Sequence, residues 1–310
     1  MKNSTTPKLL LLMSIFVIST TLFAQEGSVS QTKKDELSSE SGGLTKKLDL
    51  KLPFMKKEQK PQLSFFTGFA NFSRNDLEGA MSPIQMYGAS VGTNSIIRPT
   101  KERNIIEQEY SGFTFLVGGA TEVVHYANSM LGSKNAINTT QFGFEQTSGY
   151  GYDLGSDIDL MLLVSDYATW TSIRPQTYSD QFTQDNWQRI DDFSGSLRYG
   201  STMAPTVEVK AGDHFSVKAS YSWTQVLPRH MFWYWAGSEM IEGIAARIAE
   251  TVINGFGDKE ISSKPIMHFV LQNAVAYGFK ELRRKNMNWP FDTVAPMNIT
   301  SWNIGLSYTF

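Results

Sequence analysis

The amino-acid sequence predicts an all-β fold: an antiparallel transmembrane β-barrel of about 10–12 strands, with one amphipathic helix in a long connection. Three observations predict it. Apolar and polar residues alternate along most of the chain from Leu63 onward, as in strands with two different faces. Many of these segments reach the roughly 9–11 residues that a tilted strand needs to cross a bilayer, longer than strands of soluble proteins. The last alternating segment ends on the final residue, Phe310.

The composition agrees with a β-rich or membrane-interface protein. Aromatic residues make up 13% of the 310 residues, with 20 Phe, 12 Tyr and 7 Trp. The formal net charge is -2, which gives no basic field for nucleic acid. The chain has no cysteine, which excludes disulfides, thiolate metal sites and cysteine nucleophiles.

The N-terminus has the pattern of a secretory signal. Lys2 and Lys8 precede the apolar run "LLLLMSIFVISTTLFA", which predicts a signal peptide over 1–24, with cleavage after Ala24. Residues 25–61 are rich in Lys, Glu, Ser and Gly, so this segment buries too little apolar area to fold alone. We expect a flexible periplasmic tail there, followed by the barrel over 62–310.

Ten segments have the alternation of strands. They are 62–74, 84–94, 110–125, 137–149, 156–168, 192–200, 204–211, 214–227, 265–280 and 298–310. Tight hairpin turns are expected at Gly212–Asp213 and around Ser201–Ala204. A soluble secreted β-sandwich is the rival fold, but the strand length favours the membrane barrel.

One segment has helical periodicity instead. Over 237–255, Ile241, Ala245, Ile248 and Val252 fall on one face of a helix, and Ser238 is the expected N-cap. With ten strands and both termini in the periplasm, the connection 228–264 falls on the periplasmic side. There Trp233 and Trp235 are expected interface anchors, and the helix lies on the inner leaflet, plugs the lumen or docks a periplasmic partner.

In lipid, all backbone polar groups of a β-protein must be paired, so the strands form a closed barrel. One face of each strand then contacts lipid and the other faces the lumen. In the last strand the alternation gives one apolar face with aromatic residues at its two ends, as in an apolar band between aromatic girdles. This lipid face consists of Trp302, Ile304, Leu306, Tyr308 and Phe310. Trp302 is thus a third expected interface anchor.

The ending with Tyr308 and Phe310 resembles that of bacterial outer-membrane β-barrel proteins. The resemblance implies a bacterial outer-membrane location and makes these two residues the signal for the barrel-assembly machinery. Two inner stretches, "LGSDIDLMLLVSDY" at 154–167 and "HFSVKASYSWTQVL" at 214–227, resemble strands of porin-like barrels of the alginate-export type. That second resemblance implies transport.

The face opposite the apolar residues carries charges of both signs. The candidates for the lumen are Asp157, Asp159, Arg198, Glu208, Lys210, His214 and Lys218. They fit a network of ion pairs filling a narrow barrel, or a hydrated path that orients a charged solute. Our leading hypothesis is a porin-like channel or exporter for small polar solutes. The alternative is a non-conducting structural or anchoring barrel of an envelope assembly, with 25–61 or 237–255 binding a periplasmic partner.

An outer-membrane hydrolase is the third hypothesis. The ending "GLSYTF" also resembles the omptin proteases, in which an Asp-Asp pair and an Asp-x-His pair form the site. The nearest matches are Asp185 with Asp191 or Asp192, and Asp213 with His214. Neighbouring residues on a strand point to opposite faces, so Asp213 and His214 do not share a site there, and we expect no enzyme. The chain has no metal-ligand spacing, Walker loop or dinucleotide-binding glycine pattern, so no cofactor is indicated.

Overall fold

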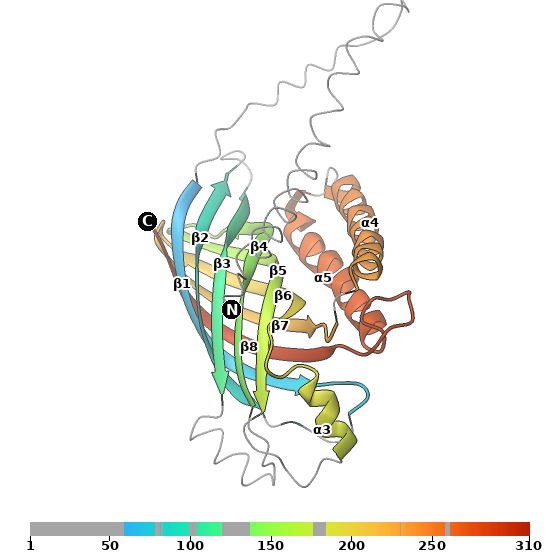
Figure 1. Cartoon of the computed structure of the whole chain (residues 1–310). Coiled ribbons are helices and arrows are strands. Elements are labelled where there is room, and N and C mark those ends of the chain that lie inside the picture. Colours follow the sequence, from blue (N-terminus) through green and yellow to red (C-terminus); the bar gives the residue numbers. More distant parts are fainter. Residues whose placement is uncertain are drawn as a thin grey trace, which may run out of the picture. The chain divides into compact units, whose positions relative to one another are not determined.

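The computed structural model describes residues 59–77, 81, 83–98, 104–119, 137–175, 184–229, 231–257 and 261–310. Eight antiparallel strands follow one another around a closed barrel, in which β1 pairs with β8 (Figure 1). The strands are β1 (Gln59–Ser73), β2 (Ile84–Ile97), β3 (Ile105–Gly119), β4 (Ile137–Asp153), β5 (Ile158–Pro175), β6 (Arg198–Ala211), β7 (Phe215–Val226) and β8 (Met297–Thr309). The connections contain α3 (Gln184–Asp191), α4 (Phe232–Gly257), the 3-10 turn η1 (Ile261–Ser263) and α5 (Lys264–Arg283).

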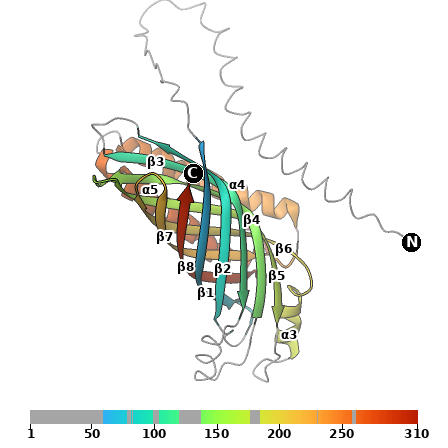
Figure 2. The ribbon, with the colours of Figure 1, turned by 90° about the vertical axis from the view of Figure 1, so that its left-hand side faces the viewer.

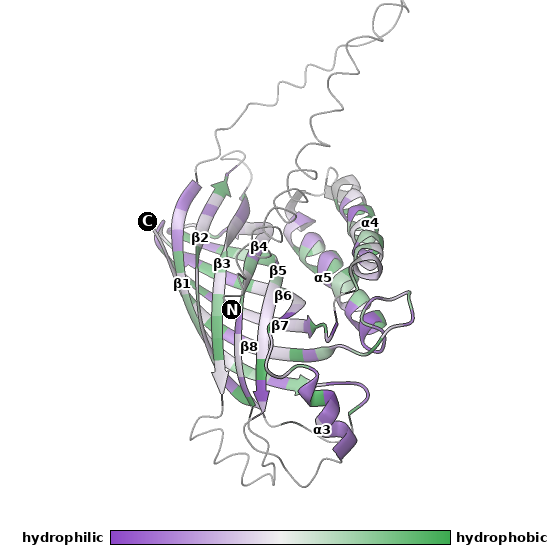
Figure 3. Ribbon diagram, in the orientation of Figure 1, coloured by the Kyte–Doolittle hydropathy of each residue, from purple (hydrophilic) through white to green (hydrophobic). Residues whose placement is uncertain are grey.

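The barrel is apolar outside and polar inside. On β8, Ile304 is 65% exposed and Leu306 is 64% exposed on the outer face, whereas Ser307 points inward and is buried. The same alternation of hydrophobic and hydrophilic residues runs along the other strands (Figure 3). Closure leaves no unpaired strand edge, which a β-protein needs in lipid. The predicted class, an antiparallel outer-membrane β-barrel, is therefore confirmed, and the expected outer-membrane location follows from it.

In the described residues the closed barrel has eight strands, not ten to twelve. Segments 192–200 and 204–211 were predicted as two strands, but they contribute to the single strand β6, and no turn lies at Ser201–Ala204. Segment 265–280 was predicted as a strand and forms most of α5. The hairpin at Gly212 is present, and its φ of 64° is a conformation that glycine adopts without steric cost.

Pro205 lies within β6 and interrupts one of its two ladders. Proline has no N–H to donate to a neighbouring strand. The ladder between β6 and β7 runs from Gly200 to Met203 and resumes at Thr206, with the register unchanged across the gap. The opposite edge of β6 stays paired through Pro205, which faces Val164 of β5. The proline therefore interrupts one ladder without ending the strand.

The two ends of the barrel differ in their connections. The start of β1 and the end of β8 lie together at one end, which we call the terminal end (Figure 2). The chain reverses there through the short connections 98–104, 154–157 and 212–214. The long connections, 74–83, 120–136, 176–197 and 227–296, leave from the opposite end, which we call the loop end. Outer-membrane barrels have short periplasmic turns and long extracellular loops, so the terminal end is the periplasmic one.

The eight-strand count moves the helical connection to the other side of the membrane from the one expected. With β7 and β8 as its flanking strands, it leaves the barrel at the loop end and returns there. The helix itself is longer than the predicted 237–255, because the aromatic run before it is helical too. Ser238 is therefore inside α4 and not its N-cap. Its side chain is buried and accepts a hydrogen bond from Arg283 Nε at 2.9 Å.

Helices α4, η1 and α5 form an antiparallel helical hairpin beside the barrel wall (Figures 1 and 2). α5 packs on the outer face of β4, β5 and β6, and α4 packs on α5. No helix in the described ranges is long and apolar enough to cross a membrane. The predicted signal peptide lies outside the described residues, as does the expected tail except for 59–61, which begin β1.

Candidate functional site

The interior of the barrel is the candidate site because it gathers charged side chains of both signs. At the terminal end, Arg98 follows β2 and reaches into the opening, where its Nη2 lies 2.6 Å from Oδ2 of the buried Asp159. Its Nη1 also lies 3.3 Å from Asp153 Oδ2. The hydrogen bond with Asp159 raises the pKa of Arg98 above its usual value. Arg98 therefore stays charged and ties three strands together at this opening.

A second ionic cluster lies further inside. The fully buried carboxylate of Glu208 accepts a hydrogen bond from Gln108 Nε2 at 3.0 Å and lies 3.9 Å from Lys218 Nζ. Lys218 Nζ also lies 5.4 Å from the centre of the Tyr110 ring. Lys210 is buried one inward position from Glu208 along β6, opposite Asp159 of β5. The structure thus brings Asp159, Glu208, Lys210 and Lys218 into the lumen.

Glu145 of β4 is a lumen carboxylate that the sequence analysis missed. It accepts hydrogen bonds from the hydroxyls of Thr114 at 2.8 Å, Thr147 at 3.0 Å and Tyr167 at 3.1 Å. Three hydroxyl donors from three strands stabilise a buried negative charge without a cation. The signal was present in the sequence, because Phe142 and Phe144 alternate with Gly143 and Glu145 and face outward.

A cavity of about 80 Å³ lies in the middle of the lumen. A buried water needs about 10–15 Å³ by this measure, so the cavity has room for several waters and for little else. About half of its lining residues carry hydroxyl groups, and the lining also includes apolar side chains, one carboxylate and one ammonium group. Representative lining residues are Ser90, Gln141, Glu145, Thr202, Lys218 and Ser301.

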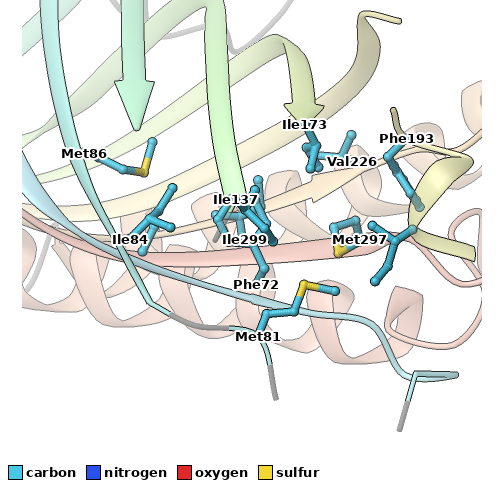
Figure 4. Packing of buried hydrophobic residues seen from close by; sticks show 12 residues of the cluster. Phe72, Met81, Ile84, Met86, Ile137, Ile173, Phe193, Val226, Met297 and Ile299 are labelled. Carbon is cyan, nitrogen blue, oxygen red and sulfur yellow. The ribbon is translucent and has the colours of Figure 1, made fainter. Parts of the chain in front are cut away.

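The loop end of the lumen is closed by an apolar cluster, which we call the plug (Figure 4). Its members come from six strands, the connection after β1 and the segment around α3. They are Ala70, Phe72, Met81, Ile84, Met86, Ile137, Ile173, Ile190, Phe193, Val226, Met297 and Ile299. Each of these side chains is almost completely buried, so the plug excludes water from this opening.

Arg74 holds α3 over the plug. Its Nη1 donates to the Arg189 carbonyl oxygen at 2.7 Å, and its Nε lies 2.8 Å from Asp76 Oδ1. Burial lowers the pKa of Arg74, although Asp76 partly offsets this. In return, Arg189 donates to the Asp76 carbonyl oxygen. The connection after β1 and the helix α3 therefore form one cover on the barrel.

Three predicted lumen residues lie elsewhere. Asp157 is in the turn after β4 with a positive φ of 59° and is exposed. His214 is in the turn after β6, where its Nδ1 is 2.7 Å from the Thr309 carbonyl oxygen and its ring stacks on Tyr308. Arg198 starts β6 at the loop end and donates to the carbonyl oxygens of Pro228 and Asp192. The alternation of polar and apolar residues predicts the direction of a side chain only within a strand. It does not predict that direction in turns or at strand ends.

The residues compared with a protease site lie at opposite ends of the barrel. Asp185, Asp191 and Asp192 belong to the α3 region at the loop end. Asp213 and His214 are in the turn after β6 at the terminal end. They do not meet in one constellation. In the described part of the chain, no group of three acidic or histidine side chains is placed to hold a metal ion.

The three tryptophans expected at membrane interfaces have different surroundings. Trp302 is on the outer face of β8, 4.7 Å from the Tyr221 ring, and is 67% exposed. Trp233 is 82% exposed at the start of α4. Trp235 is half-buried and packs edge-on against Tyr199 of β6 at 5.6 Å. At the terminal end, Tyr308 and Phe310 pack edge-on against each other on the outer face.

Comparisons with known proteins found similar structures but no related sequences. No family model and no curated protein matches the chain. Neisserial surface protein A is 9% identical and has a TM-score of 0.36 over 82% of this chain and 100% of that one. Ail, the attachment invasion locus protein of Yersinia pestis, is 8% identical, with a TM-score of 0.32 over 82% of this chain and 99% of that one.

Proposed function

We propose that the chain is a non-conducting outer-membrane barrel that serves as a structural or anchoring component of the cell envelope. The observation that carries this proposal is the plug. It closes the loop end of the lumen with apolar side chains and places α3 over them. A solute entering from this side meets a dry, close-packed cluster instead of water. We therefore favour the non-conducting structural barrel over the porin-like channel.

The rest of the lumen supports the same conclusion. A channel for small polar solutes needs a continuous hydrated path. Eight strands leave an interior that side chains are just able to fill. Here Arg98 and Asp159 pair across the terminal opening, and the central cavity has room for a few waters. The mixed charges fit a network that fills the barrel and fixes its strands.

The proposed anchor has three kinds of partner. The apolar outer face contacts outer-membrane lipid. The barrel-assembly machinery recognises Tyr308 and Phe310. Signal-directed export through the inner membrane by residues 1–24 is part of the same proposal. A periplasmic partner is assigned to the tail 25–61, whose last three residues begin β1 at the terminal end. The helix 237–255 leaves from the loop end and is a weaker candidate for that role.

Planar-bilayer recordings test the non-conducting claim. Full-length protein without its signal peptide is refolded in detergent, its folding is checked by anomalous migration of unboiled samples, and it is added to a bilayer. A general porin treated in the same way is the positive control. We expect a silent bilayer at every voltage. Reproducible single-channel steps from folded protein would overturn the proposal and restore the channel hypothesis.

A further inference from the structure

The helical hairpin covers part of the barrel wall where lipid would otherwise lie. On the outer face of β5, Val164 is 6% exposed, and on the outer face of β7, Trp223 is 5% exposed. On the uncovered side, the corresponding outward residues of β1 and β8 are open, with Phe65 at 60% and Ile304 at 65%. Over these strands, the hairpin therefore covers the outer surface of the barrel that would otherwise contact lipid.

Contacts at both ends of α5 show that it runs along the height of the wall. At the terminal end, the Tyr152 hydroxyl donates to the Ser262 carbonyl oxygen at 2.7 Å, just before α5 begins. Toward the loop end, Gln225 Nε2 donates to the Lys280 carbonyl oxygen at 3.2 Å. With 20 residues, α5 is about 30 Å long, which is the thickness of the hydrocarbon core of a bilayer.

A buried ionic cluster lies between the two helices of the hairpin. Arg283 of α5 is buried, and its Nη1 lies 2.5 Å from Glu242 Oε2 and 3.2 Å from Glu239 Oε1 of α4. Asp166, on the outer face of β5, lies within electrostatic range of both glutamates. The charged groups of this part of the hairpin thus pair with one another between α4 and α5.

The outer face of the hairpin is apolar. On α4 it exposes Met240, Ile241, Ile244, Ile248 and Val252, and on α5 it exposes Ile266, Val270 and Tyr277. Two aromatic residues, Trp233 and Tyr234, are exposed where α4 begins at the loop end, the position of an interfacial girdle. The exposed charges of α4 are Arg247 and Glu250, in the half nearer the terminal end. In a bilayer, the charged ends of such long side chains extend toward the lipid headgroups, while their aliphatic parts stay in apolar surroundings.

We propose that the outer face of the helical hairpin contacts the lipid hydrocarbon, so that α4 and α5 form a lateral extension of the membrane-facing barrel wall. The apolar face is continuous with the lipid-facing surface of the strands beside it, and its height matches the bilayer. The ionic cluster around Arg283 joins α5 to α4 away from this apolar face. A second copy of the chain would bury the same face, and the experiment distinguishes the two.

Spin labels test the proposal, and the absence of native cysteine makes each introduced one unique. Ile244→Cys and Val270→Cys report on the hairpin, and both native side chains are 54% exposed. Ile304→Cys on β8 is the lipid-facing control, and Asp213→Cys in a turn is the aqueous control. Each nitroxide-labelled full-length protein is reconstituted in vesicles, and its relaxation by oxygen and by a water-soluble nickel complex is measured.

Lipid contact predicts strong relaxation by oxygen and weak relaxation by nickel at 244 and 270, as at 304. Relaxation by nickel equal to that at 213 would place the face in water and overturn the proposal. Protection from both reagents, with spin–spin broadening between copies, would assign the face to a second copy and overturn it too. Heat-modifiable migration of each labelled variant shows beforehand that its barrel is folded.

Discussion

Arg74 and Phe193 stack at the loop end of the barrel, with the guanidinium carbon 5.3 Å from the centre of the aromatic ring. Arg74 directly follows β1, and Phe193 follows α3, so the contact joins two connections far apart in sequence. Phe193 is fully buried in the plug. The pair therefore links the cover to the apolar cluster that it closes.

Arg74→Ala should loosen α3. The change removes the hydrogen bond to the Arg189 carbonyl oxygen and the ion pair with Asp76, and we expect the free energy of unfolding to fall by about 2 kcal/mol. Amide hydrogen exchange across 184–191 should become faster than in the wild type. Arg229→Ala, at an exposed arginine, is the matched control and should leave the exchange of α3 unchanged. Equal exchange in all three proteins would show that Arg74 does not hold the cover.

Glu145→Ala should destabilise the barrel more than the loss of any one of its donors. It leaves three buried hydroxyls without their shared acceptor, and hydrogen bonds to a charged group contribute about 1.5–3 kcal/mol each. Tyr167→Phe removes one of the three and should cost about 1.5 kcal/mol. Urea unfolding in lipid vesicles measures both, and the double variant should cost less than the sum. Additive costs would show that Tyr167 and Glu145 act independently.

The strand pattern and the terminal strand could be predicted from the sequence because each depends on local alternation. The lumen charges within β5, β6 and β7 follow from the same rule, since an inward position repeats every second residue. The pairing of Arg98 with Asp159 could not be predicted. It depends on which strands become neighbours and on where a connection ends, and neither is encoded in periodicity.

The identity of α5 was missed for a physical reason. Large apolar residues occupy alternate positions at Met267, Phe269 and Leu271, which imitates a strand. A helix with one polar and one apolar face has a clear helical period in its sequence. α5 instead presents apolar residues both to the barrel wall and to its outer side. Its helical period is therefore weak. Counting α5 as a strand after the helical connection, and β6 as two strands before it, kept the total even but placed the connection on the wrong side of the membrane.

Arg283→Met should loosen the contact between α4 and α5. Truncating a buried charged partner leaves Glu239 and Glu242 without their cation, which typically costs about 3–5 kcal/mol. Hydrogen exchange of α5 should rise while that of the strands stays low. Arg284→Met is a close control, because Arg284 is the next residue, is 57% exposed and pairs with Glu281 at the surface. If both variants exchange alike, the buried cluster is not what holds α4 and α5 together.

Phe310→Ala should impair assembly without lowering the stability of the assembled barrel. The Phe310 ring is 62% exposed and packs edge-on against Tyr308, so its removal creates no buried cavity, and a surface change of this kind costs about 0.5 kcal/mol or less. Its backbone N–H still donates to the Pro61 carbonyl oxygen at 2.9 Å. Cells expressing the variant should contain less folded barrel in the outer membrane, while the purified folded fraction unfolds at the wild-type urea concentration.

Leu306→Ala is the matched control for this prediction. Leu306 lies on the same face of β8 and is 64% exposed, so it resembles Phe310 in burial but precedes the Tyr308–Phe310 ending. Normal amounts of folded Leu306→Ala beside reduced amounts of Phe310→Ala would identify the ending itself as the assembly signal. Equal amounts of the two would contradict that role, because the loss would then reflect a general need for apolar groups on the lipid face.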